Sequence, residues 1–226
     1  DSTGSVNQDA GFSIVSFTGN GSTGATVGHG LGVKPDFIIL KTRSNSDTSW
    51  QLYHKSLGAT KYIQLNLSNS ATTSNTRWNN VEPTSTVFTL GSSGDVNTNN
   101  ATIIAYCFTS KQGYSKFGSY TGNGNTNGTF IYTGFKPAFM MVKCSSSSGQ
   151  WFMFDNKRIG YNSENYRLIA DVTDSEDDPG QTDFLSNGFK MRFTSGNANG
   201  SGKTYIYMAF AENPFTTSSG VPATAK

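Results

Sequence analysis

Charged residues are scarce in this sequence. Asp, Glu, Lys and Arg make up 14% of the 226 residues, and the formal net charge is +2 at pH 7. Lysines and arginines are scattered singly along the chain, so no basic stripe offers the phosphate neutralisation that nucleic-acid binding needs. The charge pattern therefore argues against a nucleic-acid partner.

Long apolar runs are also missing. The longest, such as Phe37–Leu40 and Phe139–Val142, fall far short of the ~20 residues that span a bilayer. The chain starts at Asp1 and not at Met, and no charged segment followed by an apolar one resembles a signal peptide. We therefore expect no membrane partner, and we interpret the chain as a processed product or a piece of a longer polypeptide.

The residue types that build most catalytic centres are few. Cysteine occurs only at Cys107 and Cys144, in or beside apolar runs, which favours buried free thiols; a disulfide between them is the alternative. Histidine occurs only at His29 and His54, both in the first half, and no nucleophile elbow is present. The carboxylates of the first half are too dispersed for a glycosidase pair. We predict no catalytic residue.

What is abundant is polar and small. Ser, Thr, Gly and Asn together make up 102 of the 226 residues, and all four are poor helix formers. Aromatic residues account for 13% of the chain and recur along its whole length, unlike in a disordered low-complexity sequence. This composition predicts an all-β globular protein with polar turns.

The sequence contains the same unit twice. Aligned segments recur about 102 residues apart, which leaves room only for very small insertions. The matched segments are Phe17–Gly24 with Tyr120–Asn127, Lys34–Lys41 with Lys136–Lys143, Trp50–Tyr53 with Trp151–Phe154, and Ala101–Phe108 with Lys203–Phe210. We expect the matched tryptophans, Trp50 and Trp151, to lie in the core.

Each half reads as short apolar strands bounded by Gly, Ser, Asn and Thr clusters. We predict two tandem homologous β-sandwich repeats, jelly-roll-like and related by a pseudo-two-fold axis. The predicted boundaries are a lead-in at 1–10, the repeats at 11–112 and 113–215, and a tail at 216–226. The predicted strands are 12–18, 36–42, 50–54, 62–67, 86–90 and 102–108 in the first repeat, and 114–121, 138–143, 151–155, 166–170, 189–193 and 204–211 in the second.

The Gly-rich segment Gly19–Gly24 satisfies the G-x-G-x-x-G pattern of dinucleotide-binding proteins. That motif needs a helix after it to hold the pyrophosphate, and the following segment, Ala25–Gly32, cannot form a stable helix. We therefore interpret the pattern as a turn that needs glycine at positive φ.

One polar segment carries a candidate carbohydrate site. Trp78 stands between Arg77 and the amides Asn79 and Asn80, and this segment has no clear copy in the second half. A tryptophan flanked by such groups is suited to stacking on a sugar ring. The alternative is a tryptophan that folds back and covers the end of the sandwich.

One acidic run carries a candidate metal site. Asp171, Asp174, Asp177 and Asp178 supply oxygen ligands of the kind that Ca²⁺ prefers, although their spacing matches no EF-hand loop. The alternative is a solvated loop. We expect that folding requires no cofactor, with Ca²⁺ as the one candidate.

Five segments of the sequence are distinctive, namely Gly28–Pro35, Ile104–Phe108, Gly113–Gly124, Asp183–Phe189 and Tyr205–Phe215. Together they resemble an uncharacterised duplicated domain of tailed marine bacteriophages. This domain typically forms the C-terminal part of large virion or tail-fibre-like proteins. The resemblance covers nearly the whole chain, but it brings no catalytic or ligand-binding residues with it.

The resemblance implies a setting in a virion and outside the cell. The leading hypothesis is a non-enzymatic structural protein, a tail-fibre, receptor-binding or decoration module that mediates subunit assembly or host-surface attachment. Its expected partners are other virion subunits, with the chain as a homo-oligomer, and a host-surface glycan. A carbohydrate-binding lectin module is the alternative, and a polysaccharide depolymerase domain is a further one.

Overall fold

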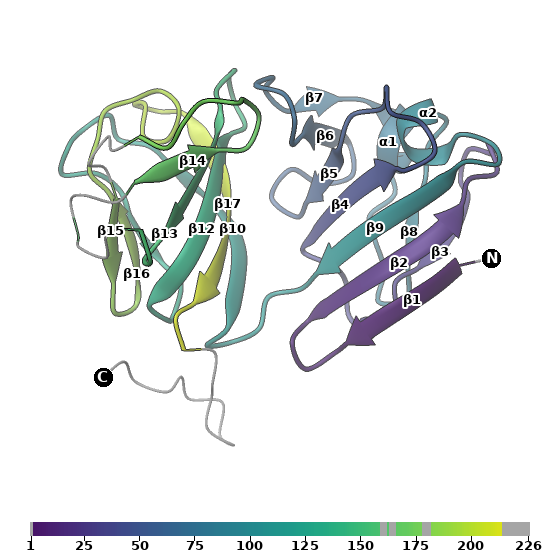
Figure 1. The fold of residues 1–226 in the computed structure, drawn as a ribbon, viewed down its shortest axis with the longest axis horizontal. Helices are drawn as coiled ribbons and strands as arrows, with labels where there is room; N and C mark the ends of the chain where they lie inside the picture. Colours follow the sequence, from purple (N-terminus) through teal and green to yellow (C-terminus); the bar gives the residue numbers. More distant parts are fainter. Residues whose placement is uncertain (1, 159–161, 163–165, 178–181, 214–226) are drawn as a thin grey trace. The chain divides into compact units, whose positions relative to one another are not determined.

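The computed structural model describes residues 2–158, 162, 166–177 and 182–213. The chain is nearly all β, with several antiparallel sheets and two short helices, so the predicted all-β class is confirmed. It divides into two compact units (Figure 1). The first comprises Asp1–Leu67 and Ala71–Thr109, and the second comprises Ser68–Ser70 and Ser110–Lys226.

The first unit contains a seven-stranded sheet in the order β1-β2-β9-β4-β5-β6-β7. Its strands are β1 (Ser2–Asn7), β2 (Phe12–Thr18), β9 (Thr102–Phe108), β4 (Phe37–Thr42), β5 (Gln51–His54), β6 (Lys61–Gln64) and β7 (Thr72–Thr73). A two-stranded sheet pairs β3 (Thr26–Gly28) with β8 (Val87–Thr89). Two helical turns, α1 (Asn75–Trp78) and α2 (Gly94–Asn97), lie near each other at one end of the unit (Figure 1).

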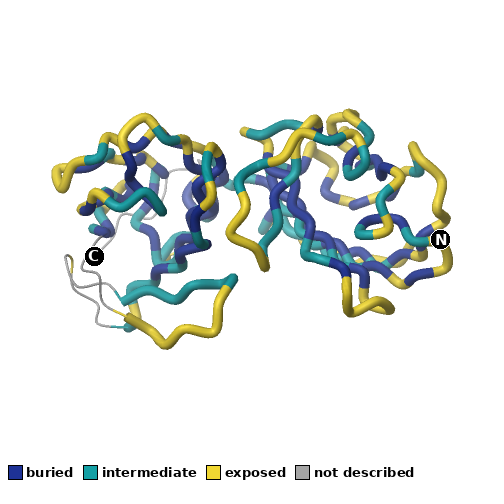
Figure 2. The backbone as a smooth tube through the Cα atoms, turned by 90° about the horizontal axis from the view of Figure 1, so that it is seen from above, coloured by how far each residue is buried: buried dark blue, intermediate teal, exposed yellow. Residues whose placement is uncertain are grey.

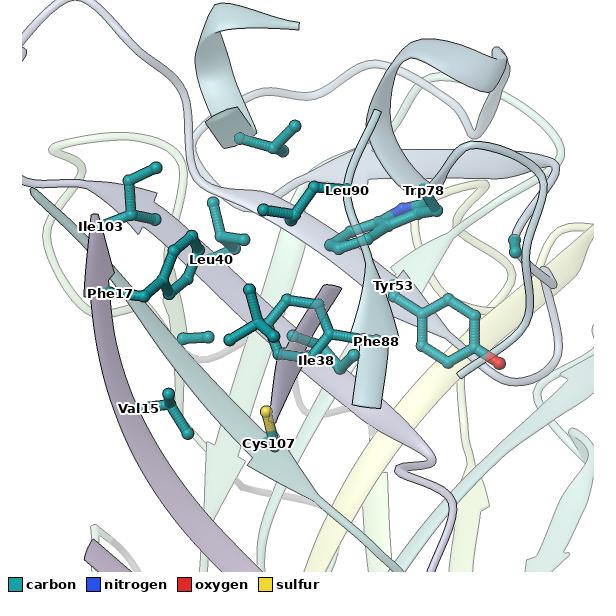
Figure 3. Packing of buried hydrophobic residues seen from close by; sticks show 14 of the residues in the cluster. Val15, Phe17, Ile38, Leu40, Tyr53, Trp78, Phe88, Leu90, Ile103 and Cys107 are labelled. Carbon is teal, nitrogen blue, oxygen red and sulfur yellow. The ribbon is translucent and has the colours of Figure 1, made fainter. Parts of the chain in front are cut away.

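The core of the first unit draws on both sheets. Burial alternates along β2 and β9, so Val15 and Phe17 from one strand and Ile103 and Ala105 from the other lie on the same buried face. Phe88 from β8 belongs to the same cluster, which Figure 3 shows from close by. The register places Val15 opposite Ala105 and Phe17 opposite Ile103, so the buried faces of the two strands are continuous.

The second unit contains a five-stranded sheet in the order β10-β17-β12-β13-β14 and a three-stranded sheet in the order β11-β16-β15. The strands are β10 (Ser115–Thr121), β17 (Thr204–Ala211), β12 (Pro137–Cys144), β13 (Trp151–Asp155), β14 (Arg167–Ile169), β11 (Phe130–Tyr132), β16 (Gly188–Met191) and β15 (Thr182–Leu185). The five-stranded order matches β2-β9-β4-β5-β6 of the first unit, strand for strand. Figure 2 shows buried backbone along the strands of each unit and exposed backbone in many of the connecting loops.

Strand β1 lies where the sequence predicted only a lead-in. All six of its residues are exposed, so no apolar periodicity marks it as a strand. It forms because it pairs antiparallel with β2 over its full length, from Ser2 opposite Phe17 to Asn7 opposite Phe12.

The matched tryptophans differ in burial. Trp151 is buried, as expected, whereas Trp50 is only half-buried.

Both cysteines are buried free thiols, as predicted. Burial raises the pKa of the Cys107 thiol to about 12, so this group stays protonated at neutral pH. Within the described ranges, no helix is long and apolar enough to cross a membrane.

Candidate functional site

A buried asparagine holds the first Gly-Asn-Gly turn. Asn97, the last residue of α2, is 2% exposed. Its Oδ1 accepts a hydrogen bond from the backbone N of Asn20 at 3.0 Å, and its Nδ2 donates to Asn20 Oδ1 at 3.2 Å and to the carbonyl of Ser22 at 2.9 Å. The backbone carbonyl of Asn97 also accepts from Gly21 N at 3.0 Å. We call this arrangement the asparagine clamp.

Two glycines make the clamp sterically feasible. A Cβ on Gly19 would lie 2.2 Å from the carbonyl oxygen of Thr98, so only glycine lets the two backbones approach. Gly21 adopts a φ of +68°, a conformation that favours glycine. The chain continues from this turn into strand β3, where a dinucleotide-binding motif would continue into a helix.

The second unit contains the same clamp. Asn199 Oδ1 accepts from Asn123 N at 3.1 Å, and Asn199 Nδ2 donates to Asn123 Oδ1 at 3.0 Å and to the carbonyl of Asn125 at 2.9 Å. Each clamp asparagine ends a Ser-Gly-x-x-Asn segment, 93–97 in the first unit and 195–199 in the second. In both segments the serine Oγ accepts from the backbone N two residues later, at 3.2 Å. Sequence reasoning missed this repeated segment, although the two copies are legible in the sequence.

A pocket of about 200 Å³ lies beside the clamp of the first unit. The residues that line it come from five separate stretches of chain. They are Ser2, Phe17, Thr18, Asn20, Ala25, Thr26, Val27, Leu90 and Asn97. None of them carries a charge. The residues fall into an apolar, little-exposed group that includes Phe17, Val27 and Leu90, and an exposed polar group of Ser2, Thr18, Asn20 and Thr26.

The second unit fills the corresponding positions with larger side chains. The backbone hydrogen bonds from Leu90 to Ala25 and from Met191 to Thr129 place Ala25 and Thr129 at corresponding positions. The hydroxyl of Thr129 donates to the carbonyl of Thr121 at 2.8 Å. Tyr120, which the sequence alignment places opposite Phe17, donates from its hydroxyl to the carbonyl of Ala198 at 2.6 Å. Phe17 and Ala25 lack these hydroxyl groups, so the two units differ in polarity and side-chain size at these two positions.

Trp78 lies inside the core, which corrects its assignment as a sugar-stacking residue. Its side chain is 1% exposed and lies in the hydrophobic cluster with Leu90 and Tyr53 (Figure 3). The ring centroids of Tyr53 and Trp78 are 6.0 Å apart, at an interplanar angle of 77°. A buried indole offers no face to a sugar, so the interpretation that the tryptophan folds back over the core describes its position.

Arg77 is occupied by structural contacts. Its Nη2 forms an ion pair with Asp95 at 2.7 Å, its Nε donates to Gln51 Oε1 at 3.1 Å, and its guanidinium carbon lies 4.5 Å from the centroid of the Tyr62 ring. These contacts connect α1 to α2 and to strands β5 and β6.

Asn79 and Asn80 form the turn after α1, and both adopt positive φ, at 52° and 55°. Asparagine tolerates this conformation better than most residues, which explains its presence twice in succession. Asn80 is exposed and Asn79 is half-buried. The four residues predicted to bind carbohydrate therefore do not form one exposed site.

The acidic residues predicted to bind a metal do not come together among the described residues. Asp171 Oδ1 accepts from the backbone N of Trp151 at 2.9 Å, and Asp177 forms a two-point ion pair with Arg167 at 2.8 Å. Asp174 is exposed, and Asp178 lies outside the described residues. Across the described ranges, no group of three or more His, Cys, Asp and Glu could hold a metal ion.

Both histidines have structural contacts. His29 is 1% exposed, its Nδ1 accepts from Leu31 N at 3.2 Å, and its Nε2 lies 3.3 Å from the carbonyl of Thr84. Burial lowers the pKa of His29, which keeps the ring neutral at pH 7. His54 Nδ1 accepts from the backbone N of Ser56 at 3.1 Å.

Glu82 ties a loop to the core. Its carboxylate accepts hydrogen bonds from Tyr53 Oη at 2.6 Å, from Ala59 N at 2.6 Å and from Lys34 Nζ at 2.7 Å. Burial raises the pKa of Glu82, but the hydrogen bonds from Lys34, Tyr53 and Ala59 outweigh it and hold the pKa below its usual value. Burial, followed by the hydrogen bond to Glu82, raises the pKa of Tyr53.

These features define the class of the protein as an antiparallel all-β protein of two units, each with a Gly-Asn-Gly turn held by a buried asparagine. The chain belongs to the family described as a domain of unknown function, DUF7483, whose family model matches residues 1–214. A search of the curated proteins and a search of the solved structures each returned no significant match.

Proposed function

We propose that this chain is a non-enzymatic structural module of a bacteriophage virion, a tail-fibre, receptor-binding or decoration module built from two tandem β-sandwich repeats of the jelly-roll-like kind. Its role is to mediate subunit assembly or attachment to a host surface, in a virion or otherwise outside the cell. The matching strand orders and the two asparagine clamps support the duplication. The resemblance of five segments to a duplicated phage domain supports the setting.

The proposal that the module is non-enzymatic rests on the contacts that the polar side chains of the first unit make. The ion pair of Arg77 with Asp95 connects α1 to α2, the hydrogen bonds of Glu82 connect its loop to Tyr53 and Ala59, and His29 accepts from the backbone N of Leu31. Side chains that are bound to other parts of the protein hold the structure together and are poorly placed to exchange protons with a substrate. The loops between them are rich in Ser, Thr and Asn, which suits a rigid surface that is recognised by neighbours.

Strand β1 supports a role in assembly. It lies at the edge of the seven-stranded sheet, all six residues are exposed, and the segment Ser2–Asn7 carries no charge and no proline. Uncharged edge strands favour pairing with a further strand. We propose other virion subunits, including further copies of this chain, as the partners at such edges, and a host-surface glycan as the attachment partner.

The described residues bear on the two alternative functions, a lectin module and a depolymerase domain. The lectin hypothesis loses Trp78 as its platform, because that ring is buried. For a depolymerase, the carboxylates of Asp155 and Glu176 both bind Arg158, with Asp155 Oδ2 at 2.7 Å from Nε. Both carboxylates are therefore engaged in ion pairs with one guanidinium, whereas a glycosidase needs two carboxylates that face the substrate.

The experiment that tests the virion setting is immunogold electron microscopy. An antiserum raised against the purified chain is applied to phage particles from a lysate in which the chain is detected by mass spectrometry. We expect gold particles on the tail or capsid surface, and none when the antiserum is first absorbed with the purified chain. Particles that carry no label while the chain remains in the soluble fraction would refute the proposal.

A further inference from the structure

A pocket lies beside the asparagine clamp of the first unit, and none of its lining residues belongs to the predicted carbohydrate or metal site. We infer that it binds one ring of a neutral carbohydrate. This inference deepens the attachment role proposed above and rests on that proposal for its biological setting, but its chemistry comes from the lining residues alone.

The size of the pocket limits the ligand. About 200 Å³ is below the roughly 300 to 1,000 Å³ of pockets that enclose drug-sized ligands. The space suits a ligand of about one sugar ring, with the remainder of any oligosaccharide lying outside the pocket. The pocket is therefore suited to a terminal or branching residue of a glycan.

The polarity of the lining specifies the ligand further. Ser2, Thr18 and Thr26 supply hydroxyl groups, and Asn20 supplies an amide. Within the described residues, these hydroxyls and the Nδ2 of Asn20 make no hydrogen bond to the protein, whereas the Oδ1 of Asn20 accepts from Ser22 N and Asn97 Nδ2. Phe17, Val27 and Leu90 are core residues at most 5% exposed, and they form the apolar floor under these polar groups. Because no lining residue is charged, nothing in the pocket compensates a charged ligand.

Comparison between the units identifies two pocket positions at which the second unit has a larger side chain with a hydroxyl group. Phe17 and Ala25 stand where the second unit has Tyr120 and Thr129, and the hydroxyls of those two residues donate to backbone carbonyls. The clamp beneath the pocket is the same in both units. The second unit therefore supplies a natural pattern for closing the pocket without breaking the clamp.

The test is a solution titration of the whole chain, followed by two-dimensional ¹H–¹⁵N NMR. The probes are the methyl glycosides of glucose, galactose, mannose and N-acetylglucosamine, with N-acetylneuraminic acid as a charged comparison. We expect at least one neutral glycoside to shift the backbone amides of Thr18, Asn20, Ala25 and Thr26 in a saturable manner. The charged sugar is expected to bind at least about tenfold more weakly, because the pocket holds no cation.

Two variants localise the binding. The double variant Phe17→Tyr/Ala25→Thr copies the second unit and is expected to weaken binding at least about tenfold by filling the space. The variant Thr18→Val/Thr26→Val keeps the side-chain shape and removes two hydroxyls, with an expected loss of roughly tenfold or more, since each hydrogen bond contributes a factor of about five. Ala10→Thr, the same kind of change in the turn between β1 and β2, is the control and should bind as the wild type does.

Three outcomes would overturn the inference. They are the absence of saturable shifts with every neutral glycoside, shifts confined to residues outside the pocket, and unchanged binding by both variants. If the variant Phe17→Tyr/Ala25→Thr fails to fold, the binding measured with Thr18→Val/Thr26→Val tests the inference by itself. The titration does not depend on the immunogold experiment. If phage particles carry no gold label while the purified chain binds a neutral glycoside, the virion setting is refuted and the carbohydrate site is retained.

Discussion

Asn97 and Asn20 bind each other through two hydrogen bonds, and Asn199 and Asn123 form the same pair in the second unit. In each pair the first residue is buried and precedes the last long strand, while the second lies in the Gly-Asn-Gly turn. The pair joins segments 77 and 76 residues apart. The turn is therefore held by a contact that no local pattern supplies.

The clamp should contribute strongly to stability. Asn97→Ala leaves the Asn20 amide and the Ser22 carbonyl without their partner, and we expect the free energy of unfolding of the first unit to fall by about 2–4 kcal/mol. Asn97→Asp, which keeps the shape but loses both donors, should cost at least as much. Urea denaturation measures both variants. The control is Asn99→Ala, at an exposed residue, and an equal cost there would contradict this role of the clamp.

Trp78 should affect stability, because its side chain belongs to the buried core of the first unit. Trp78→Ala is expected to lower the free energy of unfolding by about 3–5 kcal/mol, because it opens a cavity in the core. Trp78→Phe should cost less, since it also removes the indole Nε1, which is buried with no hydrogen-bond partner among the described residues. Denaturation is compared with that of Trp50→Ala, at a half-buried tryptophan, where we expect the smaller loss. Equal losses at the two positions would contradict the placement of Trp78 in the core.

Glu82 should make the first unit sensitive to acid. Its pKa in the folded protein is held below the ordinary value of 4.5, so the stability it contributes is complete above that value and is lost as the pH falls through the folded pKa. Glu82→Gln should therefore show a flatter decline in unfolding free energy between neutral pH and pH values below 4.5. Urea denaturation at several pH values measures the slope. Asp9→Asn, at an exposed residue, is the control, and a slope unchanged by Glu82→Gln would contradict the prediction.

Chelation should leave the folded protein unaffected. Asp171 and Asp177 are already bound to Trp151 N and to Arg167, so neither carboxylate depends on a metal for a partner. We expect the same Tm in EDTA and in excess Ca²⁺, measured by calorimetry. A Tm that rises by several degrees with Ca²⁺ would point to a site at the acidic run, whose member Asp178 lies outside the described residues.

Assembly should be visible in solution. Light scattering at micromolar concentration is expected to show a homo-oligomer, because the chain has little net charge and an uncharged edge strand in β1. Deleting residues 216–226, which lie outside the described ranges, tests whether the polar tail contributes to that assembly. A strict monomer with and without the tail would contradict the prediction and favour the lectin alternative.

The sequence predicted more of the fold than of the site. Three of the long strands, β2, β9 and β17, begin and end where the apolar pattern placed them. The predicted strand at 62–67 ends earlier in the structure, at Gln64, and the segment Asn75–Trp78 forms a helical turn that was not foreseen. Ser74 caps that turn by accepting from Thr76 N, a local contact that the polar composition of the segment concealed.

The sequence by itself determined the all-β class and the long strands, because its composition is poor in helix formers and its short apolar runs are bounded by Gly, Ser, Asn and Thr clusters. Only the tertiary structure decided that Trp78 is buried and that Ser2–Asn7 is a strand, because both depend on partners distant in the sequence. The same holds for the pocket, whose walls come from five stretches of chain. Packing between separate segments sets such a space, and no local pattern encodes it.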